Sequence, residues 1–146
     1  MKMRLSLMAT LAVSAAVVTI AVAGAPPRPT LSLSSVTVKR TAPSDGWAGT
    51  VTVNMRLCAS IGPRAQLLTR QWRAAGGRVV ARGNYEDPLG VDLDRVYPYE
   101  CAPKYMSSWL VPARLLAGPG TYYVSMRVRD GYGRLSAPIS FTFHGG

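Results

Sequence analysis

Hydrophobic and polar residues alternate along most of the chain beyond residue 30. In residues 49–60 the hydrophobic phase consists of Val51, Val53, Met55 and Leu57, and the polar phase holds threonine, asparagine and arginine. A period of two is that of a β-strand with one buried face, and no stretch beyond residue 25 shows the period of a helix. The pattern predicts seven strands, at residues 30–38, 49–60, 67–73, 78–82, 105–111, 121–129 and 137–143.

The intervals between these strands indicate how they connect. The hydrophobic phase shifts at Ser34 and Ser35, which predicts a β-bulge or a switch between sheets. Turn-forming residues predict a loop at residues 41–48 and a hairpin turn at residues 130–133. Short strands joined by turns, without helices, favour an all-β fold in which two antiparallel sheets form a sandwich.

The first 23 residues have the pattern of a secretory signal peptide. Lys2 and Arg4 precede an uncharged apolar run at residues 5–23, which ends in the small-x-small sequence Ala-Val-Ala. We expect cleavage after Ala23 and a secreted, extracellular protein. The alternative is an uncleaved membrane anchor, because the run is long enough to span a bilayer.

Three segments follow from these patterns. Residues 1–23 are the expected signal peptide, and residues 24–29 form a proline-rich linker. Residues 30–146 form the β-sandwich domain. A chain of 146 residues has room for one such domain of ordinary size.

Composition narrows the chemistry that the protein can perform. The chain has a single histidine, His144, and two cysteines, which argues against His-dependent catalysis and against a His/Cys metal centre. Asp92 and Asp94 would share one face of a strand, but the segment lacks the oxygen density of a calcium loop. We therefore expect no metal, no cofactor and no enzymatic activity.

Cys58 and Cys101 are the only cysteines of a chain that we expect to be exported, and such a pair is normally disulfide-bonded. The alternative is two free thiols, one of them a nucleophile. Cys58 is opposite in phase to Leu57. A disulfide from Cys58 should therefore tie the end of its strand to a loop around Cys101, rather than join two sheets through the core.

The last third of the chain resembles immunoglobulin-like and fibronectin-type-III-like extracellular domains. The resemblance lies in GPGTYYV at residues 118–124 and RDGYGRLS at residues 129–136. It implies that Tyr122 makes a tyrosine corner and that Trp72, fourteen residues after Cys58, is the buried tryptophan of the family. The chain departs from the antibody pattern at Val124, where those domains have their second cysteine.

Residues 84–104 are the first candidate binding surface. The segment contains five of the seven acidic residues of the chain and three prolines. Tyrosine is suited to recognition because it offers a large amphipathic area at low entropic cost. The alternative is that residues 91–96 form an ordinary edge strand. The candidate binding residues of this loop and its border are Tyr85, Tyr97, Tyr99 and Tyr105.

A basic sheet face is the second candidate. The chain has 17 Lys and Arg against 7 Asp and Glu, a formal net charge of +10. If Trp72 and Tyr122 point inward, an arginine-rich face with one tyrosine points outward and would attract an anionic partner. Alternatively, these arginines only discourage edge pairing and keep the protein soluble. The residues of this face are Arg73, Arg78, Arg82, Tyr123, Arg127 and Arg129.

These patterns favour a secreted, non-enzymatic recognition module that uses the disulfide-pinned tyrosine loop. Its partner would be a protein or an anionic cell-envelope polymer. Without a nucleic-acid module in the sequence, we do not expect a nucleic-acid partner. The alternatives are an inhibitor that presents residues 98–103 to a secreted hydrolase, or a structural subunit of a cell-surface assembly. A hydrolase that uses Asp92 and Asp94 is the least favoured hypothesis.

Overall fold

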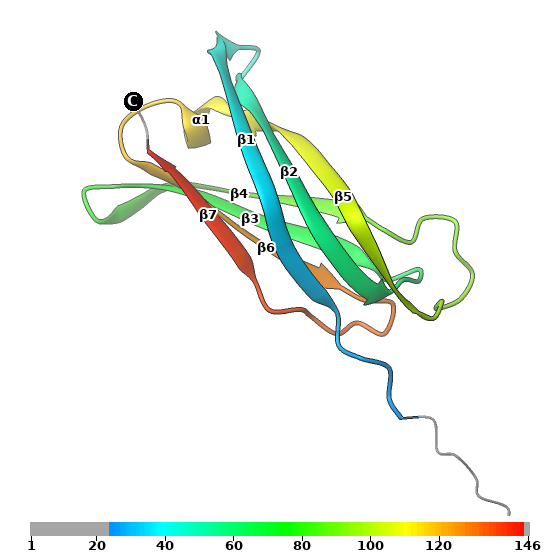
Figure 1. The fold of residues 1–146 in the computed structure, drawn as a ribbon. Helices are drawn as coiled ribbons and strands as arrows, with labels where there is room; N and C mark the ends of the chain where they lie inside the picture. The colour runs from blue at the N-terminus through cyan, green and yellow to red at the C-terminus, as the bar shows by residue number, and fades with distance from the viewer. Residues whose placement is uncertain (1–23, 145–146) are drawn as a thin grey trace, which may run out of the picture.

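The computed structural model describes residues 24–144. The expected signal peptide and the last two glycines lie outside these residues. Within them the chain forms seven strands and one short helix (Figure 1). In chain order these are β1 (Thr30–Ser44), β2 (Trp47–Ser60), β3 (Gln66–Ala75), β4 (Arg78–Pro88), β5 (Tyr99–Pro112), α1 (Ala113–Leu116), β6 (Thr121–Arg129) and β7 (Ile139–His144).

The strands form two antiparallel sheets that pack face to face (Figure 1). One sheet has the order β1-β2-β5 and the other β4-β3-β6-β7. At one side of the sandwich β1 lies close to β7, and Arg40 Nη2 donates a hydrogen bond to the His144 carbonyl oxygen at 2.6 Å. The all-β sandwich of two antiparallel sheets predicted from the sequence is confirmed, and its architecture is consistent with an immunoglobulin-like fold at this coarse level. No helix in residues 24–144 has the length and apolar character needed to cross a membrane.

The core lies between the sheets and is built from the predicted inner phases of β2 and β6. Val51, Val53 and Met55 are fully buried on β2, and Val124 and Met126 face them from β6. Further core side chains come from β3, β5 and α1: Leu67, Trp109, Val111, Leu115 and Leu116.

Two connections near the N-terminus test the predicted turns. The bulge predicted at Ser34 and Ser35 is present, because the β1–β2 register shifts between Leu33 and Ser35. The loop predicted at residues 41–48 is wrong. Both strands continue to a tight hairpin at Asp45 and Gly46, whose φ angles of 51° and 83° are positive.

The tryptophan predicted to be buried on β3 is not the core tryptophan. Trp72 lies on the outer face of its sheet and stacks on Tyr123, with ring centroids 5.3 Å apart. Trp109 of β5 fills the core instead and is 5% exposed. The inner phase of β3 is Leu67, Thr69 and Gln71, one residue out of step with the prediction.

Cys58 and Cys101 form the predicted disulfide. They are directly opposed on β2 and β5, with Cα atoms 4.0 Å apart, so the bond lies within one sheet rather than between the two. The prediction that the disulfide does not cross the core is therefore correct. The prediction that Cys101 lies in a loop is wrong, because β5 begins two residues before it.

Candidate functional site

The tyrosine-rich segment at residues 84–104 is mostly strand. Residues 84–88 belong to β4 and residues 99–104 to β5, so the connecting loop comprises residues 89–98. Residues 91–96 do not form the alternative edge strand either, since they lie within this loop. The long recognition loop expected from the sequence is thus replaced by a ten-residue connection between two edge strands.

Two of the four candidate tyrosines point into the sandwich. Tyr85 is half-buried and stacks on Trp109, with centroids 5.8 Å apart. The Tyr105 hydroxyl donates to Asp87 Oδ2 at 3.0 Å, and burial together with this carboxylate raises the pKa of Tyr105. These contacts hold the facing edges of the two sheets together, so the two side chains are occupied by packing.

Tyr97 and Tyr99 lie nearer the surface. Tyr97 is 38% exposed, and the Arg95 guanidinium lies 5.2 Å from the centroid of its ring. Tyr97 also borders a hollow of about 190 Å³ beside Cys101, lined mainly by apolar side chains. Tyr99 is half-buried and pairs with Ser60. A candidate contact surface remains here, but it is centred on one tyrosine.

The carboxylates of the same loop are not arranged as predicted. Asp92 and Asp94 do not share a strand face, because both lie in the loop and Asp92 has a φ of 68°. Among residues 24–144 no group of three or more His, Cys, Asp or Glu side chains is positioned to hold a metal ion.

The basic face is present with a different membership. Since Trp72 points outward, Arg73 points to the opposite side, where it donates hydrogen bonds to the carbonyl oxygens of Arg114 at 3.1 Å and Pro119 at 2.9 Å. Arg70, two residues before Trp72, takes its place on the outer face. The prediction of an inward Trp72 gives β3 the wrong phase, and this is why it leaves Arg70 off the basic face.

On β4, a bulge separates two arginines that were expected to share a face. Arg82 pairs with Trp72 and therefore lies on the outer face. The register shifts between Arg73 and Ala74, so Arg78 pairs with Ala75 in the phase of Arg73. Arg82, Tyr123, Arg127 and Arg129 thus share the outer face with Arg70, whereas Arg73 and Arg78 do not.

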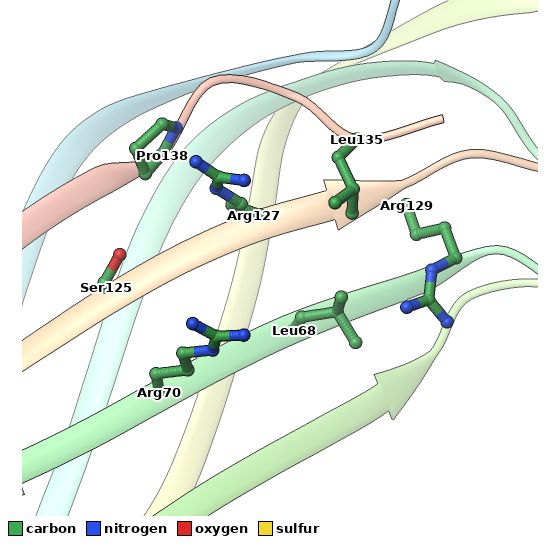
Figure 2. Close-up of a pocket in the computed structure, with 7 residues that line it drawn as sticks. All are labelled: Leu68, Arg70, Ser125, Arg127, Arg129, Leu135 and Pro138. Carbon is green, nitrogen blue, oxygen red and sulfur yellow. The ribbon is translucent and has the colours of Figure 1, made fainter. Parts of the chain in front are cut away.

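Three of these arginines surround a hollow on the outer face. Arg70 comes from β3, and Arg127 and Arg129 come from β6 (Figure 2). The hollow has a volume of about 260 Å³ and is completed by small or apolar residues. These are Leu68, Ser125, Leu135 and Pro138.

The charge of this hollow is not neutralised from within. None of its lining residues is acidic. Glu86 lies on the same face, opposite Leu68 on β4, but does not line the hollow. Arg129 donates to the neutral Gln66 Oε1 at 3.0 Å, and the one salt bridge in the described part of the chain joins Arg134 to Asp130. We define the arginine face as Arg70, Arg82, Arg127 and Arg129.

The Asp130–Arg134 pair organises the turn next to the arginine face. Asp130 is fully buried and accepts hydrogen bonds from the backbone N–H groups of Tyr132 and Arg134, at 3.0 and 2.8 Å. Arg134 binds the same carboxylate at 2.7 Å and also donates to the carbonyl oxygens of Pro26 and Pro27. The sequence predicted a turn here, but gave no sign that its arginine holds the proline-rich linker against the domain.

No known family model matches the chain, and no curated protein matches it in sequence.

Proposed function

We propose that this protein is an exported, non-enzymatic binding module whose arginine face holds an anionic partner. The observation that carries the proposal is the hollow between Arg70, Arg127 and Arg129, which concentrates three guanidinium groups without a carboxylate among its lining residues. Guanidinium groups bind carboxylate, sulfate and phosphate groups through paired hydrogen bonds, and a surface of one charge also accelerates encounter with an oppositely charged partner.

The rest of the surface supports this assignment over the tyrosine loop. Two of the four candidate tyrosines, Tyr85 and Tyr105, are engaged in packing, whereas the arginines around the hollow lie on one open sheet face. Export rests on the N-terminal pattern, with the Cys58–Cys101 disulfide as a second indication of an oxidising compartment. The solitary histidine, His144, lies at the exposed end of β7, where its Nδ1 is 3.2 Å from Thr121 Oγ1, and neither residue lines the hollow of the arginine face.

Retention on beads of sulfated dextran, with neutral dextran beads as the reference, tests the proposal. The protein expressed with its own N-terminal segment should bind the sulfated beads and elute as salt rises, since salt screens exposed charges. The double variant Arg70→Ser with Arg127→Ser should elute at clearly lower salt. The control variant Lys39→Ser with Lys104→Ser removes the same charge from exposed positions on the other sheet.

Equal elution of the two double variants would mean that net charge, not the arginine face, governs retention. The variant Tyr97→Ala with Tyr99→Ala distinguishes the other surface. If it loses binding while the arginine variant retains it, the surface around Tyr97 and Tyr99 is the site and the proposal is wrong.

A further inference from the structure

We infer that the partner of the arginine face is an extended acidic polysaccharide, bound along a track that runs from Arg82 through the central hollow to Arg28 in the proline-rich linker. This inference rests on the proposed function and adds the shape and chemical class of the ligand. The supporting observation is that the central hollow has lining residues in common with the hollow on either side of it.

The central hollow adjoins one on each side. Arg70 also lines a hollow that contains Trp72 and Arg82, at the β3–β4 side of the sheet. Arg127 and Leu135 also line a hollow that contains Arg28, beyond β6. Because neighbouring hollows share lining residues, the three form a row on the surface, and each has at least one arginine in its lining.

The length of this track exceeds that of a small anion. Arg82 is opposite Trp72, and Arg129 is opposite Gln66, six residues away on β3. The rise of about 3.3 Å per strand residue makes that part of the track about 20 Å long, before the hollow around Arg28 is added. A single phosphate or sulfate would occupy one hollow, whereas a polymer could contact arginines in all three.

Arg28 has a defined place in the track because the linker is held. Arg134 Nη1 donates to the Pro26 carbonyl oxygen at 2.8 Å, and Nη2 donates to that of Pro27 at 3.0 Å. The buried Asp130 carboxylate fixes the guanidinium of Arg134 in turn. Pro29, on the other side of Arg28, is buried. Arg134 is therefore a positioning residue, and Arg28 is the contact.

The uncharged walls of the track favour a sugar polymer over a polyphosphate. Leu68, Leu135 and Pro138 line the central hollow, and Trp72 lines the next one. The carbon faces of sugar rings can pack on such side chains while their carboxylate or sulfate groups reach the arginines. A polyphosphate has no apolar surface to place there.

Calorimetry with sulfated and uronate-containing oligosaccharides of graded length tests this inference. We expect an octasaccharide to bind at least tenfold more tightly than a disaccharide of the same repeat. Arg28→Ser and Arg82→Ser should each weaken the octasaccharide several-fold and leave the disaccharide nearly unchanged, because they act at the two ends of the track. Lys39→Ser should change neither.

Arg134→Ala tests the positioning role. It should lower the affinity for the octasaccharide by as much as Arg28→Ser does. The double variant Arg28→Ser with Arg134→Ala should bind the octasaccharide only slightly more weakly than either single variant. Circular dichroism and thermal melting establish that each variant is folded. Additive losses in the double variant would show that Arg134 does not act through Arg28.

The other outcomes separate this inference from the proposed function. If the disaccharide or inorganic sulfate binds as tightly as the octasaccharide, the extended track is wrong while the arginine face still binds anions. If polyphosphate, an acidic peptide or single-stranded DNA binds more tightly than every oligosaccharide, the polysaccharide assignment is wrong. If no anion binds, the proposed function itself fails.

Discussion

Replacing Gln71 with leucine should destabilise the sandwich, because it removes the acceptor that two buried donors share. Gln71 is buried on the inner face of β3, between the two sheets. Its Oε1 atom accepts a hydrogen bond from Trp109 Nε1 at 2.9 Å and another from the Tyr122 hydroxyl. Because an indole nitrogen can only donate, the amide oxygen must be the atom that faces it.

The magnitude follows from the groups that the substitution leaves without a partner. Leucine has a similar size but no acceptor, so the indole N–H and the Tyr122 hydroxyl would both remain buried and unpaired. Each such donor costs about 1–3 kcal/mol. The added apolar contact offsets part of that cost, and we expect a loss of about 2–4 kcal/mol in the free energy of unfolding. Tyr122→Phe removes one donor and leaves the other bonded, so it should cost about 0.5–1.5 kcal/mol.

Urea denaturation of the two single variants and the double variant measures these values and the coupling between the residues. In the Tyr122→Phe background, Gln71→Leu leaves only the indole unpaired, so its cost should fall by about 1 kcal/mol or more. A Gln71→Leu variant no less stable than Tyr122→Phe, or additive losses in the double variant, would refute the shared acceptor. The tyrosine corner implied by the resemblance would have the Tyr122 hydroxyl bonded to the backbone. The hydroxyl instead donates to the Gln71 side chain on β3.

Three further predictions concern the disulfide, the buried carboxylate and the tyrosines. The double variant Cys58→Ala with Cys101→Ala removes a disulfide of sequence separation 43, and in urea denaturation the free energy of unfolding should fall by about 2–4 kcal/mol. Its far-ultraviolet circular dichroism spectrum should stay unchanged. Loss of that spectrum would contradict a bond confined to one sheet. Asp130→Ala should lower the free energy of unfolding by about 3–5 kcal/mol, because it leaves the Arg134 guanidinium and two backbone N–H groups of the turn without their acceptor. A loss below about 1 kcal/mol in the same assay would show that the turn does not depend on the Asp130 carboxylate. Burial raises the pKa of Tyr105 and Tyr122, so the stability that depends on their neutral form is complete below about pH 10, the ordinary tyrosine pKa, and is lost as pH rises toward the raised values. Ultraviolet titration should therefore show these two of the seven tyrosines ionising only as the protein unfolds, and ionisation of all seven in the folded state would contradict this.

The sequence was informative wherever a strand has a clean hydrophobic phase. Val51, Val53 and Met55 on β2, and Val124 and Met126 on β6, are buried as the alternation predicts. Alternation is a local property, because successive side chains of any strand point to opposite faces. Strand content, the two-sheet architecture and the bulge in β1 could therefore be predicted from the chain alone.

On β3 the same reasoning failed for a physical reason. Its inner face carries Thr69 and Gln71, whereas its outer face carries Leu68 and Trp72, so hydrophobicity alone favours the wrong phase. Gln71 can be buried because Trp109 and Tyr122 supply donors from other strands. Those partners are 38 and 51 residues away, which no local pattern reveals.

The candidate site was decided in the same way. The sequence showed an excess of arginine and suggested a basic sheet face, and Arg82, Arg127 and Arg129 do lie on it. Strand register then placed Arg70 on that face, a bulge turned Arg78 away, and pairing with β3 and β2 drew most of residues 84–104 into strands. Composition and hydrophobic period are local properties of the sequence. A sheet surface, in contrast, is assembled from strands that are neighbours in space but distant in the chain. Only the tertiary structure could therefore determine which arginines lie side by side.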